Sequence, residues 1–257
     1  MIPLLQKPAA SREIFNPHPY QRYCIHRVVT DSILGLFLDM GLGKTVITLT
    51  GVNDLMYNRF TVRKTLVIAP KKVAEATWTD EAERWEHLRL LRVQTVLGSE
   101  RQRLRALSTP ADIYVIGRDN VQWLVDHYRQ NWPFDMVVLD ELSSFKNPSS
   151  NRFKAMKRVR PKIQRVLGLT GTPAPNSLLD VWAQVYLLDE GQRLYPRFEQ
   201  FRTRFFDKIP RGDFHTYTSK IGAEEAIKAA IEDICISMKA EDYLELPELV
   251  RNRIPVE

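Results

Sequence analysis

The sequence predicts an α/β fold in which a central, mostly parallel β-sheet is flanked by helices. Two observations lead to this prediction. Short apolar runs alternate with segments of helical periodicity, and glycine-rich or polar residues follow directly after several of the runs. A length of 257 residues allows one large domain or two small ones, with ample core. The regular alternation favours a single domain.

The apolar runs give the expected elements in chain order. Strands are expected at 33–38, 65–69, 93–97, 113–116, 136–139 and 165–169, because short, mainly apolar runs are typical of a parallel sheet buried on both faces. Helices are expected at 46–56, 73–85 and 120–128. Trp78 and Trp85 lie seven residues apart, which places them on one helical face and indicates packing into the core.

The first expected strand is followed by a glycine-rich loop, Gly41-Leu42-Gly43-Lys44-Thr45. A strand, a glycine-rich turn and a helix place backbone N–H groups around a phosphate, and glycine permits a close approach that a Cβ would block. Lys44 is then the positive charge on the β- and γ-phosphates, and the Thr45 hydroxyl is a candidate Mg²⁺ ligand. The strict pattern has glycine where this chain has Leu38, so a glycine-rich turn that binds nothing stays an alternative.

Asp140 and Glu141 close the expected strand at 136–139. Acidic residues at the carboxyl end of a parallel strand lie where α/β sheets bind ligands. Asp140 can hold Mg²⁺, directly or through water, and Glu141 can be the general base that orients the attacking water. An exposed acidic pair that opens a loop is the alternative, and it fits poorly downstream of a phosphate-binding loop. The two motifs together predict an enzyme that hydrolyses ATP with Mg²⁺.

A third polar motif, Thr170-Gly171-Thr172-Pro173, follows the expected strand at 165–169. Its threonine hydroxyls can hydrogen-bond the acidic motif and respond to the γ-phosphate. The same residues also fit an ordinary turn, because Gly and Pro interrupt regular structure.

In this order, the motifs resemble the first RecA-like lobe of a superfamily-two helicase, and more narrowly the Swi/Snf-related DNA-dependent ATPases. The matching stretches are 19–21, 39–45, 66–70, Trp78 with Glu81 and Trp85, 139–141, and 169–173 with Asn176. Together they cover roughly residues 15 to 250. The resemblance implies the three-layer α/β/α fold of a RecA-like P-loop NTPase lobe.

The resemblance also implies a role for each matching residue. The implied catalytic residues are Lys44, Asp140 and Glu141. The implied ATP contacts are Gln21, Met40, Gly41, Leu42, Gly43, Lys44 and Thr45, and Mg²⁺ is expected at Thr45 and Asp140. The implied nucleic-acid and coupling residues are Pro70, Lys71, Arg118, Asp119, Thr170, Gly171 and Thr172. The Gln21 amide would pair with the N6 and N7 edge of adenine, with a solvated helix residue as the alternative.

The chain departs from the family pattern at two places. Phe37-Leu38-Asp39 precedes the glycine-rich loop, where the family usually has a small residue and then Asp-Glu. The acidic motif continues with Leu142-Ser143, where the family commonly has a small residue and then histidine. Ser143 could replace that histidine as a hydrogen-bonding group. Small phage-type members of the family look similar to this variant.

The whole chain, 1–257, is expected to be the ATP-binding domain, with its core at 15–240 and the start of a linker at 241–257. The linker would lead to a second RecA-like lobe, in the same gene product or in a partner chain. That lobe would carry an arginine that neutralises charge on the γ-phosphoryl group, so the isolated chain is expected to be weakly active.

The leading interpretation of function is an ATP-dependent translocase on duplex DNA, whose contacts to phosphates give little sequence preference. One alternative is a nucleotide-gated DNA-binding module without turnover of its own. Another is an RNA-unwinding enzyme of the same superfamily.

Composition agrees with a polyanionic partner without requiring one, since the net charge is +6. Basic residues at helical spacing in 151–160 are expected to follow a phosphate backbone. Two cysteines and five histidines without metal-ligand spacing argue against a disulfide framework and a zinc site. No signal peptide and no apolar stretch of roughly 18 residues is evident. The protein is therefore expected to be soluble and intracellular, in the cytoplasm or with the nucleoid, or in the host cytoplasm if phage-encoded.

Overall fold

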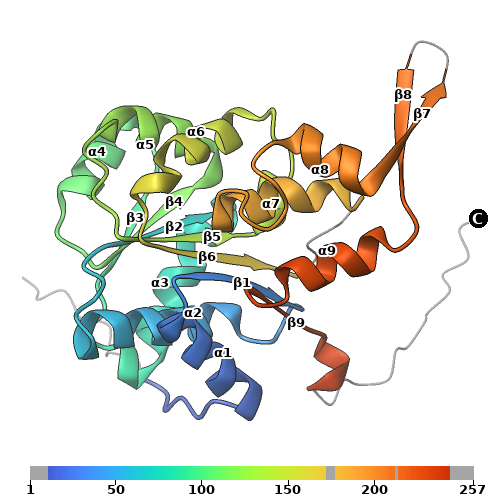
Figure 1. Ribbon diagram of the computed structural model, residues 1–257. Coiled ribbons are helices and arrows are strands. Elements are labelled where there is room, and N and C mark those ends of the chain that lie inside the picture. Colours follow the sequence, from blue (N-terminus) through green and yellow to red (C-terminus); the bar gives the residue numbers. More distant parts are fainter. Residues whose placement is uncertain (1–10, 172–176, 212–213, 244–257) are drawn as a thin grey trace, which may run out of the picture.

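The computed structural model describes residues 11–171, 177–211 and 214–243. Its centre is a seven-stranded sheet in which neighbouring strands are parallel, in the order β3-β4-β2-β5-β6-β1-β9 (Figure 1). The strands are β1 Ile33–Leu38, β2 Thr65–Ala69, β3 Val93–Val96, β4 Ile113–Gly117, β5 Met136–Asp140, β6 Arg165–Thr170 and β9 Cys235–Met238. The six expected strands are all present, and none of their ends differs from the prediction by more than one residue.

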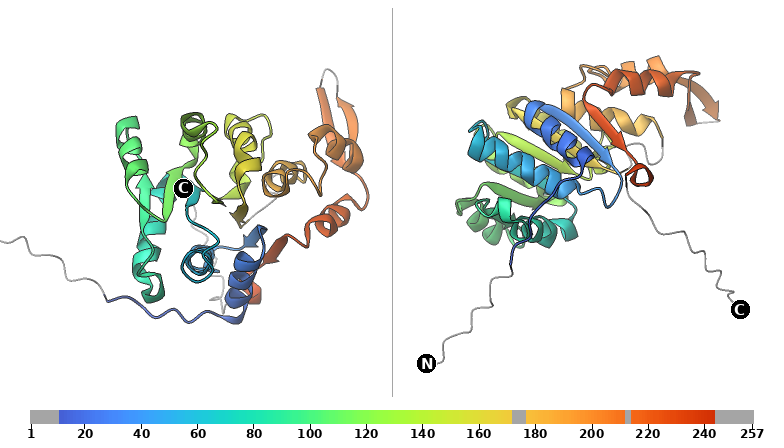
Figure 2. Two further views of the ribbon diagram at one scale, coloured as in Figure 1. Left: turned by 60° about the vertical axis from the view of Figure 1, so that its left-hand side comes forward. Right: turned by 90° about the horizontal axis from the view of Figure 1, so that it is seen from below.

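Helices cover both faces of the sheet (Figures 1 and 2). The α-helices are α1 Pro19–Thr30, α2 Lys44–Asn53, α3 Trp78–Arg84, α4 Glu100–Ser108, α5 Val121–Tyr128, α6 Asn151–Val159, α7 Leu179–Asp189, α8 Phe198–Phe205 and α9 Ala223–Ile231. Successive residues of one strand enter different hydrophobic clusters: Leu36 and Leu38 pack with the α1–α3 side, and Phe37 packs with the opposite side. This alternation along buried strands builds the predicted three-layer α/β/α fold.

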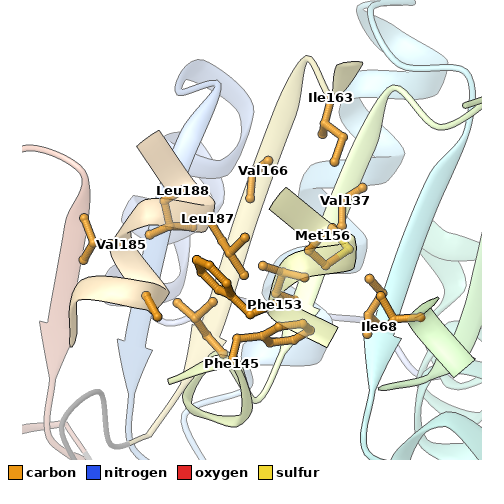
Figure 3. Packing of buried hydrophobic residues seen from close by; sticks show 14 of the residues in the cluster. Ile68, Val137, Phe145, Phe153, Met156, Ile163, Val166, Val185, Leu187 and Leu188 are labelled. Atoms are coloured by element: carbon orange, nitrogen blue, oxygen red, sulfur yellow. The ribbon is translucent and has the colours of Figure 1, made fainter. Parts of the chain in front are cut away.

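One of the two clusters lies between the sheet and α5–α9 (Figure 3). Phe145, Phe153 and Met156 pack there against Val137 and Val166 of the sheet, and all five side chains are at most 3% exposed. Full burial of an apolar side chain of this size contributes about 1.5–3 kcal/mol relative to exposure. The cluster therefore holds α6 and the segment that contains Phe145 against the sheet.

The helix expected at 73–85 differs in form from a single α-helix. It begins as a π-helical turn, η2 Val73–Thr77, continues as α3, and ends at Arg84. Trp85 follows the helix with extended backbone, φ −97° and ψ 131°. The predicted shared helical face is therefore wrong for Trp85, although both tryptophans pack against the same cluster and Trp78 is 1% exposed. The helix expected at 46–56 likewise divides into α2 and the π-helical η1 Asp54–Asn58.

The C-terminal part contains elements that the sequence pattern did not reveal. Strands β7 Phe206–Arg211 and β8 Phe214–Ser219 form an antiparallel hairpin that projects beyond α8 (Figure 1). After α9, the short strand β9 pairs with β1 and extends the central sheet. The expected linker at 241–257 is described only as far as Tyr243, after the short helix η7 Ala240–Asp242. Among the described residues, the helices lack the length and hydrophobicity that a bilayer crossing requires.

Candidate functional site

The glycine-rich loop joins β1 to α2 and has the backbone geometry of a phosphate cradle. Gly41 and Gly43 have φ of 86° and 78°, in the left-handed region that favours glycine. A Cβ on Gly43 would lie 2.7 Å from Gln21 Nε2, so a larger residue here would displace the Gln21 side chain. Gly43 caps α2 without any side-chain cap from the described residues. The first N–H groups of α2 can therefore bind an anion.

Lys44 folds back over the end of β1. Its Nζ donates to the carbonyl oxygens of Leu38, at 2.5 Å, and Asp39, at 3.1 Å. Burial lowers the pKa of Lys44, while the nearby carboxylates of Asp140, Glu141 and Asp39 oppose that shift. Lys44 and the acidic motif, about a hundred residues apart in sequence, therefore lie in one electrostatic environment.

Asp140 ends β5 and is turned into the protein. Burial raises its pKa, and a hydrogen bond from Trp78 partly offsets that rise. Trp78 Nε1 donates to Asp140 Oδ2 at 2.9 Å. The seven-residue spacing of Trp78 and Trp85 predicts packing and does not reveal this hydrogen bond. A signal was available, because a buried tryptophan N–H usually finds an acceptor.

Glu141 is held by hydroxyl groups from two other positions. Thr170, at the end of β6 and 0% exposed, donates from Oγ1 to Glu141 Oε1 at 2.9 Å. Ser143 Oγ donates to the same oxygen, which agrees with the proposed replacement of the family histidine. Glu141 itself adopts φ 59° and ψ 63°, a left-handed conformation that is strained for a residue with a side chain. Strain of this kind persists where surrounding bonds fix one orientation, and it clusters at functional sites.

Gln21 lies beneath the loop and does not face solvent. It is 7% exposed, its Oε1 accepts from the backbone N–H of His18 at 2.9 Å, and its Nε2 donates to Leu42 O at 3.5 Å. The solvated alternative for Gln21 is therefore wrong. The Leu42 side chain is fully buried, so Leu42 contributes to the loop through its backbone groups. The Met40 side chain is 82% exposed.

A cavity of about 700 Å³ lies over the loop. Its lining includes Gln21, Gly43, Lys44 and Thr45 together with the aromatic Trp85. The volume is in the usual range for a small-molecule site, which is about 300–1,000 Å³. A lining that joins the glycine-rich loop to an aromatic side chain suits a nucleotide.

The donor set at the phosphate end fits Mg²⁺. Thr45 lines the cavity, and Asp140 ends β5, where its carboxylate shares the electrostatic environment of Lys44; both side chains carry the oxygen atoms that Mg²⁺ prefers. No group of three or more His, Cys, Asp or Glu residues forms an all-protein metal cage among the described residues. This matches the way Mg²⁺ is usually bound, by one or two protein ligands together with phosphate and water.

Two of the loops implied in nucleic-acid contact come together at the sheet edge. Pro70 and Lys71 follow β2, while Arg118 and Asp119 form the short helix η4 Arg118–Asn120 after the adjacent strand β4. Lys71 and Asp119 line one cavity of about 440 Å³, together with Arg103 of α4. Lys71 is 78% exposed. Of the other residues implied in coupling, Thr170 ends β6 and contacts Glu141, and Gly171 follows it. Thr172 lies outside the described residues.

The basic stretch 151–160 is less available to a phosphate backbone than its spacing indicated. Arg160 is 5% exposed and its guanidinium donates to the carbonyl oxygens of Leu187, Leu188 and Ile163. The expectation of a phosphate contact is therefore wrong for Arg160, which instead ties α6 to the end of α7. Arg158 pairs with Asp126 at 2.7 Å on the surface.

Comparison with known proteins agrees with this geometry. The family model of the SNF2-related domain matches residues 22–237. Putative protein p41 of Acyrthosiphon pisum secondary endosymbiont phage 1 is 36% identical over 251 residues, which are 95% of this chain and 55% of the relative. An uncharacterized ATP-dependent helicase of Mycoplasma pneumoniae is 32% identical over 148 residues, 56% of this chain and 14% of that protein.

A solved structure shares the fold. The SWI2/SNF2 ATPase core of Sulfolobus solfataricus, in complex with dsDNA, superposes with a TM-score of 0.70 over 92% of this chain and 47% of that chain, at 24% identity. This chain thus spans about half the length of the phage relative and of the Sulfolobus core. Since the family model covers nearly all of the fold that carries the loop, the acidic motif and the β6 motif, the chain belongs to the SNF2-related domain family, whose members are helicase-like ATPases with a RecA-like fold.

Proposed function

We propose that this chain is the ATP-binding lobe of a DNA-dependent ATPase that couples Mg-ATP hydrolysis to movement along duplex DNA. The observation that carries the proposal is the convergence of Lys44 with Asp140 and Glu141 at one edge of the sheet. A glycine-rich turn without a ligand does not account for two carboxylates that are buried or hydrogen-bonded close to it. Burying such charges is costly without a function or a partner.

The residues divide the chemistry between them. The N–H groups of 41–45 and the Lys44 ammonium would hold the β- and γ-phosphates, with the adenine towards Gln21 and the aromatic wall of the cavity. Thr45 and Asp140 would hold Mg²⁺, which supplies charge neutralisation on the phosphate oxygens when bound. Glu141, fixed by Thr170 and Ser143, would orient the attacking water and accept its proton.

Nucleic acid would contact the loops after β2 and β4. Lys71 and Arg118 offer positive charge at adjacent strand ends, and the Sulfolobus relative was solved with dsDNA. Contacts of this kind go to phosphates, so we expect duplex DNA to bind with little sequence preference.

A second RecA-like lobe, in the same gene product or in a partner chain, would complete the site. Its arginine would stabilise the transferring γ-phosphoryl group, an effect worth about 10³–10⁵ in rate in related enzymes. The chain by itself would then bind ATP and turn it over slowly.

The test is ATP turnover by the longest product of this gene with duplex DNA, single-stranded DNA, RNA and no nucleic acid. Duplex DNA is expected to stimulate turnover most. Lys44→Ala is expected to reduce turnover to background while the circular dichroism spectrum stays that of a folded α/β protein, because the lost ammonium acts on phosphate. Normal turnover by Lys44→Ala would contradict the assignment of the loop.

The other outcomes separate the alternatives. Preferential stimulation by RNA would indicate an RNA-unwinding enzyme. Mg-ATP binding without turnover, whatever the nucleic acid, would indicate a nucleotide-gated binding module. Either result would replace the translocase proposal.

A further inference from the structure

The indole of Trp78 lies against the carboxylate that the proposed function assigns to Mg²⁺. Trp78 Nε1 and Asp140 Oδ2 are 2.9 Å apart, although the two residues are 62 positions apart in sequence. The contact arises because β2 and β5 are neighbours in the sheet, and the helical segment after β2 places its tryptophan beside the end of β5. Both residues are shielded from solvent, since Trp78 is 1% exposed and Asp140 is partly buried.

Packing alone does not account for this bond. A leucine or phenylalanine would fill the same core space, whereas the indole N–H is the one polar group that tryptophan adds. A hydrogen bond to one carboxylate oxygen restricts rotation about the carboxylate and leaves the second oxygen in a defined direction. Partners of this kind orient metal-binding side chains in many proteins.

The same segment leads to the loop that the proposed function assigns to nucleic acid. The Ala74 N–H donates to Pro70 O at 2.9 Å, which joins the loop to the π-helical turn η2, and η2 runs directly into Trp78. Single π-helical turns are often found at functional sites. Lys71, with 78% of its side chain exposed, lies at the solvent end of this connection, and Trp78 lies at its buried end.

We propose that Trp78 is a positioning residue, whose indole N–H orients Asp140 for a divalent cation and links the cation site to the nucleic-acid loop at 70–72. The inference rests on the proposed function for the identity of the cation and of the nucleic acid. It adds a residue whose hydrogen bond to Asp140 connects the cation site with the nucleic-acid loop and can be observed by spectroscopy.

The decisive variant is Trp78→Phe, which keeps an aromatic ring and deletes the N–H. Its matched control is Trp182→Phe. Trp182 lies in α7, and its buried indole N–H donates at 3.0 Å to the backbone oxygen of Tyr195 and not to a carboxylate. The full 257-residue chain is titrated with Mn²⁺ by electron paramagnetic resonance in the presence of a non-hydrolysable ATP analogue. Analogue binding is measured separately in EDTA.

We expect Trp78→Phe to weaken Mn²⁺ binding by about tenfold or more, the usual effect of losing an outer partner of a metal ligand. Binding of the metal-free analogue should stay unchanged, which a general loss of structure would not allow. Trp182→Phe should bind Mn²⁺ as the unaltered chain does. Equal Mn²⁺ affinity in Trp78→Phe and the unaltered chain would overturn the inference, as would a complete lack of Mn²⁺ binding by the unaltered chain.

A second measurement does not depend on the folding of Trp78→Phe. The chain has five tryptophans, so the Trp78 indole resonance in a ¹⁵N-labelled sample can be assigned by replacing the other four one at a time. We expect this resonance to shift when Mg²⁺ is added to the analogue-bound chain, and to shift again with a duplex oligonucleotide. No shift with Mg²⁺ overturns the positioning role, and no shift with duplex overturns the link to the loop. Neither readout needs hydrolysis, so a failure of the proposed ATPase activity is scored separately.

Discussion

Removing the hydroxyl groups that hold Glu141 tests the catalytic arrangement directly. Thr170→Val preserves the shape of the side chain and deletes the 2.9 Å bond to Glu141 Oε1. Ser143→Ala deletes the second donor to that oxygen. A hydrogen bond to a charged group is worth about 1.5–3 kcal/mol. If a substitution removes the free energy of one such hydrogen bond from the transition state, the lower figure corresponds to a fall of roughly tenfold in turnover.

The two donors share one acceptor, so their effects should not be independent. Either hydroxyl alone can still orient Glu141, and the double variant should therefore lose more activity than the product of the two single losses. Coupling energies between residues in one hydrogen-bond network are about 0.5–3 kcal/mol.

The assay is steady-state ATP turnover by the longest gene product at saturating Mg-ATP and duplex DNA. Ser144→Ala is the control, because the buried Ser144 hydroxyl has no hydrogen-bond partner among the described residues. It should turn over ATP as the unaltered protein does. If the double variant Thr170→Val/Ser143→Ala retained full turnover, the hydroxyls would not orient the base and this assignment would be refuted.

Three further predictions concern stability and binding. Arg160→Ala should lower the free energy of unfolding in urea by about 3 kcal/mol, because buried carbonyl groups lose a charged donor. Arg158 forms an exposed ion pair with Asp126, so Arg158→Ala should cost less than about 1 kcal/mol. Equal losses in the two variants would contradict this prediction. Gly43→Ala, at φ 78°, should strain the loop by about 1–2 kcal/mol and weaken ATP binding in calorimetry; unchanged affinity would count against the cradle. Burial alone would raise the pKa of Asp112, but hydrogen bonds from Arg92 and Tyr57 outweigh it and lower the pKa. The destabilisation by Asp112→Asn should therefore be full at pH 7 and shrink as pH falls below the ordinary carboxyl pKa of about 3.9; a pH-independent difference in urea unfolding would refute it.

Much of the sheet and the candidate site could be predicted from sequence because their signals are local. Most strands of the central sheet are short, mainly apolar runs, and the glycine-rich loop with Lys44, Asp140 and Thr170 lie at or just after the ends of such runs. In a parallel sheet, the carboxyl ends of strands share one edge, so residues just after different strands are expected to meet there.

The elements that were missed have weak local signals. Strand β9 is four residues long and contains one fully buried position, Ile236, so its sequence lacks a continuous apolar run. It becomes a strand because β1 offers an unpaired edge beside it. The hairpin β7–β8 likewise depends on cross-strand pairing, which no periodicity within a single segment specifies.

The sequence by itself determined the α/β class and six of the seven strands of the central sheet, and it pointed to the residues that we propose for phosphate, Mg²⁺ and water chemistry. Only the tertiary structure decided that Trp78 bonds Asp140, that Arg160 is buried under α7 and that Gln21 lies beneath the loop. The physical reason is that periodicity records which face of an element is buried, whereas a contact between residues 62 positions apart depends on which strands become neighbours in the sheet. Strand order is set by the packing of the whole core, so the partners of each polar group follow from it.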